Sequence, residues 1–170
     1  LLLYFSLWMV IGAAGFVAST QSGDMSTSIK HTVISVFLTL GSVLIAATIR
    51  NDPQNHARLV MSGLFVAMVL SAFLGAFGYL NLIPGGYELL TKFDRAKAAF
   101  KDPNVYGAFL VPAIVYALHS MATARAGRAL VQAALGALVC LGVLVSFSRG
   151  AWFQAALAIL LYAGVAFLAS

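Results

Sequence analysis

Two arginines close to predicted helix starts are the residues of this sequence best suited to chemistry. Arg149 directly follows Ser148, and Arg95 shortly precedes Asn104. An arginine guanidinium can donate two parallel hydrogen bonds to a phosphate. The free N–H groups and partial positive charge of a helix N-terminus favour the same kind of anion. Arg95, Asn104, Ser148 and Arg149 therefore form a candidate binding site for a diphosphate.

The residues around each arginine indicate why a helix should begin there. Asp102 is a favoured N-cap and Pro103 a favoured first helical residue, so we expect a helix to begin at this pair. Asn104 then lies in the first turn, where its amide could orient a ligand or a loop backbone. Ser148 can cap a later helix in the same way, which places Arg149 in the first turn of that helix.

A second interpretation of Arg149 needs no ligand. The residue lies between two long apolar runs, so it must reach the interface, pair with an acid or bind an anion. Pairing with Asp94 or Asp102 would only tie helices together. Two arginines and two helix starts on one side of the membrane favour the anion site over this ion pair.

The composition fixes the class of protein that must position these residues. The chain has 170 residues, of which 62% are hydrophobic and only 9% are charged, and its mean hydropathy is +0.97. A soluble domain of this length needs many more surface charges. We therefore predict an integral membrane protein whose immediate partner is the lipid bilayer, with no nucleic-acid partner. The single cysteine, Cys140, lies in an apolar run and cannot supply a cysteine cluster, and we assign no metal and no cofactor.

Apolar runs of membrane-spanning length predict an all-α, polytopic transmembrane bundle. We expect about six transmembrane helices and one short interfacial helix in a single domain, residues 1–170. The chain begins without Met and ends inside an apolar run, so we expect it to be part of a longer protein. The six predicted spans are residues 1–19, 32–49, 59–80, 103–122, 129–147 and 150–169.

The long connection over residues 81–102 carries the interfacial helix. Tyr87, Leu90 and Phe93 recur at about helical spacing with charges between them, which is typical of an amphipathic helix in the interface. For Lys92 and Lys97, contact with lipid headgroups is at least as good an interpretation as a role toward a substrate.

Charge counts leave the orientation in the membrane open. Alternation of the spans puts four basic residues on one side and six, including Arg95 and Arg149, on the other. The positive-inside rule weakly favours the second side as cytoplasmic. The first side has two short and clearly basic turns, which favours the opposite orientation.

Two stretches resemble the signature motifs of the O-antigen ligase and O-antigen polymerase superfamily, bacterial membrane proteins of polysaccharide assembly. Residues 95–104, RAKAAFKDPN, resemble the family pattern Arg-x-x-Gly-x-Phe-x-x-Pro-Asn. Residues 148–151, SRGA, resemble its Ser-Arg-Gly-Ala pattern. The resemblance covers about residues 95–169, and the order and spacing of the motifs make it more specific than either motif alone. Ala98 departs from the pattern, which has glycine there.

The resemblance implies a metal-independent glycosyltransferase in the bacterial inner membrane. Such a protein transfers a glycan from an undecaprenyl-diphosphate carrier to lipid A core or to a growing polysaccharide at the periplasmic face. Arg95 and Arg149, with Asn104 and Ser148, would then bind the diphosphate and stabilise it as it leaves. The side that carries these motifs, including the 81–102 connection, would be periplasmic, that is, extracytoplasmic.

The family's catalytic histidine would lie beyond Ser170, in a large periplasmic loop, so the catalytic residue is unknown here and we expect the isolated segment to be inactive. His31, His56 and His119 lie at positions that do not fit that role. Two other classes stay open. A transporter or flippase for an anionic lipid-linked substrate would also need arginines at helix ends, and a non-catalytic membrane scaffold would use them only for ion pairs.

Overall fold

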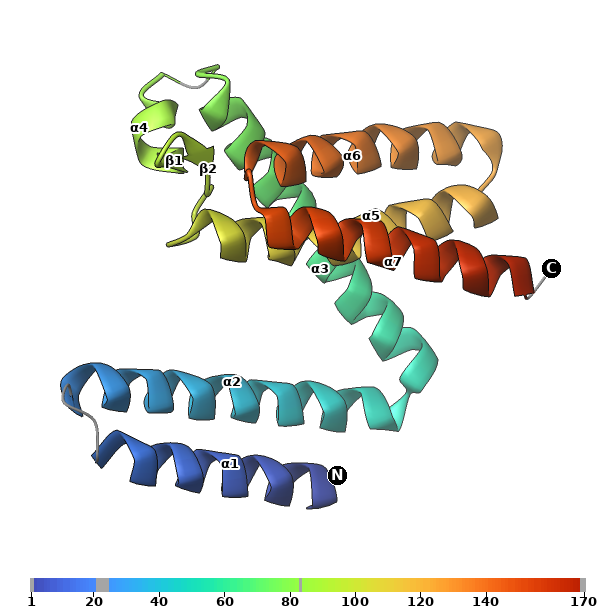
Figure 1. The fold of residues 1–170 in the computed structure, drawn as a ribbon. Helices are drawn as coiled ribbons and strands as arrows, with labels where there is room; N and C mark the ends of the chain where they lie inside the picture. The colour runs from blue at the N-terminus through green and yellow to red at the C-terminus, as the bar shows by residue number, and fades with distance from the viewer. Residues whose placement is uncertain (1, 21–24, 83, 169–170) are drawn as a thin grey trace. The chain divides into compact units, whose positions relative to one another are not determined.

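The chain forms seven helices and one two-stranded hairpin within the residues that the computed structural model describes, 2–20, 25–82 and 84–168. Figure 1 shows their order along the chain. The helices are α1 (Leu2–Thr20), α2 (Met25–Asn51), α3 (Pro53–Tyr79), α4 (Gly86–Leu90), α5 (Pro103–Thr123), α6 (Ala126–Val145) and α7 (Arg149–Leu168), and the strands are β1 (Thr91–Lys92) and β2 (Arg95–Ala96).

Five of these helices could cross a membrane by length and composition: α2, α3, α5, α6 and α7. In α1 the apolar stretch Phe5–Val17 is shorter. The outward faces of these helices carry many exposed large apolar side chains. Exposure of such side chains is unfavourable in water and favourable in lipid. The protein is therefore an all-α, multi-spanning membrane protein, as its composition predicts.

The described residues divide into two compact units, Leu1–Val60 and Met61–Ser170. In the first unit α1 packs on α2. We predicted that α2 would begin at residue 32, but it begins at Met25. The Ser/Thr-rich segment before residue 32 is helical, and hydroxyl groups along α2 donate to carbonyls of the preceding turn. Thr32 Oγ1, for example, donates to the Ser28 carbonyl at 3.0 Å.

The connection between the predicted spans 32–49 and 59–80 is also much shorter than expected. Helix α2 runs to Asn51 and α3 begins at Pro53. Asp52 Oδ1 accepts from the Asn55 backbone N–H at 3.3 Å, and Oδ2 accepts from the Asn55 amide at 2.8 Å. These bonds lower the pKa of the Asp52 carboxyl. Asp52-Pro53 thus starts a helix by the same cap and first-turn proline that we recognised only at Asp102-Pro103.

The core of the second unit is built around α5, which packs on α6 and α7; Figure 1 shows the three helices running alongside one another. Tyr106 of α5 is fully buried and is the largest side chain in this core. A Cβ built on Gly75 of α3 would lie 2.1 Å from the Tyr106 hydroxyl, and one on Gly142 of α6 would lie 2.8 Å from it. Two glycines therefore provide the space in which the tyrosine ring lies between three helices.

The connection between α3 and α5 differs from the predicted amphipathic helix. Helix α4 has only five residues and ends at Leu90, and Thr91 adopts an extended conformation. Strands β1 and β2 then pair antiparallel, with Thr91 opposite Ala96. Phe93 lies in the hairpin turn, not on the helix that its spacing from Leu90 suggested. The β-branched Thr91 favours a strand over a helix, and the tertiary contacts of the hairpin, described next, hold it in place.

Candidate functional site

Arg95 joins three elements of the second unit at one end of its helices. Its Nε donates to the Ser146 carbonyl at 2.8 Å, and its Nη2 donates to Asn104 Oδ1 at 2.8 Å. The first bond reaches the end of α6 and the second reaches the first turn of α5. Two of the five N–H donors of an arginine are used in this way. Arg95 is thus half-buried and holds the hairpin against both helices.

Asn104 and Asp102 form the start of α5 as the sequence predicts. Asp102 is the N-cap, and its Oδ1 accepts from the Asn104 backbone N–H at 2.8 Å. Pro103 is buried at the first helical position. The Asn104 side chain accepts a hydrogen bond from the Arg95 side chain, which differs from the loop-backbone contact considered for it.

Arg149 has a different environment from Arg95. It is the first residue of α7 and its side chain is exposed. Ser148 is buried, and its Oγ accepts from the Ala151 backbone N–H at 3.2 Å, so it caps this helix as predicted. The oxygen atoms of Asp94 and Asp102 that form hydrogen bonds accept from Tyr87 and Asn104. Within the described part of the chain, no ion pair within 4.0 Å joins Arg149 to either acid.

The elbow between α6 and α7 is tightly bonded. Ser146 is fully buried, and its Oγ donates to the Val143 carbonyl at 2.6 Å and accepts from the Ser148 N–H at 3.2 Å. Trp152 Nε1 donates to the same Val143 carbonyl at 3.1 Å. The backbone reverses at Phe147, which has a φ of 47°. The position of Arg149 is therefore set by a turn in which the side chains of Ser146, Ser148 and Trp152 all form hydrogen bonds.

The starts of α5 and α7 pack directly against each other. A Cβ on Gly107 would lie 2.6 Å from Ser146 Oγ and 2.9 Å from the Ala151 Cβ. Only a residue without a side chain allows this approach. Arg95 and Arg149 lie at the same end of the unit, because Arg95 bonds to Ser146 and Arg149 follows three positions later. Any anion held by both would bind over the packed helix starts and not between them.

Ala98 adopts a backbone conformation that favours glycine. Its φ is 47°, in the left-handed region, and its side chain is buried. Its N–H, like that of Lys97, donates to the Leu90 carbonyl, at 3.1 Å and 2.9 Å respectively. The backbone conformation that favours glycine is thus present here with alanine, whose small side chain still fits.

The residue that the sequence interpretation missed is Ser146. Its contribution to the arrangement is its backbone carbonyl, which accepts from Arg95. Every residue carries a carbonyl, so no residue type could have indicated this partner. The long-range contact between β2 and the end of α6 exists only in the folded chain.

An apolar hollow of about 380 Å³ lies in the first unit, between α1 and α2, and is lined by Trp8, Gly12, His31 and Val36 among others. None of the four candidate site residues lines it. Its walls are almost entirely apolar, so it is suited to a hydrocarbon chain and not to an anion.

Comparison of the chain with protein-family models, with curated proteins and with solved structures finds no match. The class of the protein therefore rests on the chain itself. It is a multi-pass membrane protein with five described helices long and apolar enough to span a bilayer. At one end of the second unit, Arg149 is exposed at the start of α7. Three residues earlier in the chain, the Ser146 carbonyl accepts a hydrogen bond from Arg95.

Proposed function

We propose that the full-length protein is an O-antigen ligase-like glycosyltransferase of the bacterial inner membrane. It would transfer a glycan from an undecaprenyl-diphosphate carrier to lipid A core or to a growing polysaccharide at the periplasmic face. The observation that carries the proposal is Arg149, an exposed guanidinium in the first turn of α7 without an acidic partner within the described residues.

The electrostatics of the site support a diphosphate ligand. The N-terminal N–H groups and partial charge of α7 add to the charge of Arg149. No acidic residue occurs in the first turn of α7 to offset them. Arg95 keeps three N–H donors after its bonds to Ser146 and Asn104. Both arginines could therefore approach one ligand, with Arg95 positioned by its two hydrogen bonds and Arg149 exposed at the start of α7.

In the proposed reaction the bond between the sugar and the carrier phosphate breaks, and a hydroxyl of the acceptor forms the new glycosidic bond. Negative charge develops on the departing diphosphate, and the arginines would stabilise it. Asn104 and Ser148 would act through position, because Asn104 orients Arg95 and Ser148 caps the helix that carries Arg149. The base that accepts the hydroxyl proton is not one of these four residues.

The test compares Arg149→Lys and Arg149→Ala with Arg125→Lys in the full-length protein, reconstituted in nanodiscs. Arg125 is also exposed but precedes α6, at the opposite end of that helix from Ser146. The measurements are binding of undecaprenyl diphosphate and glycan transfer from a lipid-linked donor. Loss of a bidentate charged hydrogen bond should weaken binding by about tenfold to a hundredfold in both Arg149 variants.

Arg125→Lys should leave binding and transfer unchanged. Normal binding and transfer in Arg149→Lys would contradict the diphosphate assignment and favour a scaffold that needs only charge. Movement of the lipid-linked substrate across a vesicle membrane without formation of a glycosidic bond would instead identify a transporter or flippase.

A further inference from the structure

Phe93 has a backbone conformation that aromatic residues rarely adopt. The pairing of Lys92 with Arg95 leaves Phe93 and Asp94 as a two-residue turn. Their φ angles are 53° and 54°, as in a type I′ turn, which favours residues such as Asn-Gly. Asn or Gly at position 93 would give a more stable turn. The presence of phenylalanine therefore needs a reason other than the stability of the hairpin.

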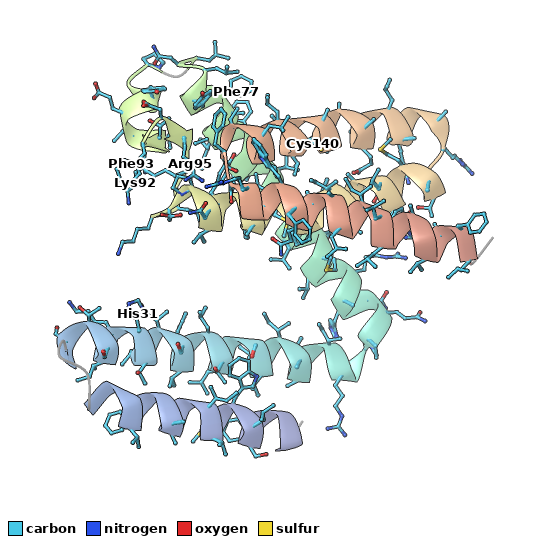
Figure 2. All side chains as sticks on the ribbon, in the orientation of Figure 1. His31, Phe77, Lys92, Phe93, Arg95 and Cys140 are labelled. Carbon is cyan, nitrogen blue, oxygen red and sulfur yellow. The ribbon has the colours of Figure 1, made fainter. Side chains whose placement is uncertain are left out.

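The same side chain is also almost fully exposed. Phe93 is 79% exposed, and Leu89 in the preceding helix α4 is 73% exposed. Lys92 Nζ lies 5.2 Å from the centroid of the Phe93 ring. Figure 2 shows Lys92 and Phe93 together at the outer edge of the hairpin, with Arg95 toward the helices. The apolar side chains of Phe93 and Leu89 and the Lys92 ammonium group thus lie close together, and the rest of the second unit leaves the two apolar side chains exposed.

The position of the hairpin places this surface at the membrane boundary. Arg95 bonds to the carbonyl of Ser146, directly after the last residue of α6, a helix long enough to span a bilayer. The first turns of α5 and α7 lie close to the same point, because Gly107 of α5 lies against Ser146 and Ala151. At the end of a membrane-spanning helix, the surroundings are lipid headgroups and the first carbons of the acyl chains.

We propose that the hairpin is an anchor in the bilayer interface, with Phe93 and Leu89 among the upper acyl carbons and Lys92 on lipid phosphates. Burial of the apolar side chains in lipid would offset the disfavoured turn. A lysine beside the ring matches the phosphate layer. A second copy of the chain fits less well, because contact through this surface would bring two Lys92 ammonium groups together. The proposal does not depend on the proposed transferase activity.

An anchor would also position the site. The hairpin that carries Phe93 carries Arg95, two residues later, and Arg95 holds Asn104 and the Ser146 carbonyl. Contact of the turn with lipid would therefore fix the level of Arg95 and Arg149 relative to the headgroups. A lipid-linked substrate presents its phosphates at that same level.

The first test measures depth in the bilayer with Phe93→Trp, and with Glu88→Trp as the matched control. Glu88 is exposed and lies on α4 in the same connection. The full chain is placed in nanodiscs whose lipids carry bromine on acyl carbons near the headgroup, and the emission of the parent protein is subtracted. The emission added by Phe93→Trp should be quenched about twofold or more and shifted to shorter wavelength. Emission from Glu88→Trp should be quenched less than that of Phe93→Trp and should lie at longer wavelength.

The second test uses Phe93→Asn, which removes the apolar contact and suits the turn better, so loss of folding cannot explain the result. Hydrogen exchange of the amides at residues 92–96 should be slower in nanodiscs than in a phosphate-free maltoside detergent for the parent chain. Phe93→Asn should abolish that difference. It should leave the Lys97 and Ala98 amides, which bond to the Leu90 carbonyl, protected as before.

Quenching of Phe93→Trp no stronger than that of Glu88→Trp would overturn the anchor. The same conclusion would follow if the Phe93→Asn variant kept the full difference between nanodisc and detergent. Protection that rises with protein concentration in detergent, without quenching by brominated lipid, would identify a second copy on this surface and would also overturn the proposal.

Discussion

Arg95 Nε donates to the carbonyl of Ser146 at 2.8 Å across 51 positions of the sequence. This bond joins the hairpin to the end of α6, where a helix leaves carbonyl groups without partners within the helix. The same guanidinium bonds to Asn104 at the start of α5. One side chain therefore connects three elements around the start of α7, which carries Arg149.

Arg95→Lys tests this connection. Lysine cannot supply the planar fork that reaches Ser146 and Asn104 together, so at least one bond should be lost. The free energy of unfolding in detergent should fall by about 1–3 kcal/mol, the range for a hydrogen bond to a charged group. Amide exchange at residues 91–98 should accelerate. Arg128→Lys, an exposed change in α6, is the control and should alter neither quantity. An unchanged exchange rate in Arg95→Lys would show that the hairpin is held by other contacts.

The Tyr106 hydroxyl allows a test of the packing between α3, α5 and α6. This oxygen is buried and has no hydrogen-bond partner among the described residues. Gly142→Ala would place a Cβ 2.8 Å from it and from Leu110 Cδ1. The resulting overpacking should cost about 1–3 kcal/mol of stability. Tyr106→Phe by itself should be neutral or stabilising, because it removes an unpaired polar group.

The double variant Gly142→Ala with Tyr106→Phe should recover part of the lost stability, measured as a coupling energy in a double-mutant cycle. Gly164→Ala in α7 is the matched control, because nothing lies within 4 Å of its added Cβ. Additive effects in the cycle would mean that the alanine is opposed by other atoms, with Leu110 the first to consider.

Ala98 offers a test of the left-handed backbone. Ala98→Gly should fold and change stability by no more than about 1 kcal/mol, since relief of strain and loss of unfolded-state restriction oppose each other. Ala98→Val combines a β-branched residue at a φ of 47° with a buried site, and it should cost about 2 kcal/mol or more. Thermal unfolding in one detergent measures both. Equal stability of the two variants would contradict the strained conformation.

The contact between α4 and the hairpin turn should depend on pH. The Tyr87 hydroxyl donates to Asp94 Oδ1 at 2.9 Å, and this bond to a carboxylate raises the pKa of Tyr87 above its usual 10.0. Because the folded pKa is above the unfolded one, the bond contributes fully below pH 10. Its contribution is lost as the pH rises through the folded pKa.

Ultraviolet titration, read as the difference between the parent chain and Tyr87→Phe, should therefore show a midpoint above 10. In the Asp94→Asn background the midpoint should fall back toward the usual value. A midpoint that is the same with and without the Asp94 carboxylate would show that the bond does not form in solution.

Features that depend on residues close together in the sequence were predicted from it. Where such a prediction was wrong, the cause was also local. Long apolar runs gave the all-α membrane class. The Asp102 and Ser148 caps are present where they were predicted, because a cap is an interaction between residues a few positions apart. The same rule applied to Asp52 would have placed the start of α3 correctly. The Tyr87–Phe93 spacing indicated a helix, but the chain turned at Thr91 into a hairpin.

Only the tertiary structure decided which of the two arginines forms hydrogen bonds with distant parts of the chain and which is exposed. Arg95 and Arg149 look alike in the sequence, each beside a helix start, yet Arg95 bonds to Ser146 and Asn104 while Arg149 is exposed. The difference arises from a backbone carbonyl, which has no residue-specific signal, and from contacts between distant parts of the chain. Such contacts depend on how the helices pack, and here Gly107 and Gly142 allow that packing by leaving room at two crossing points.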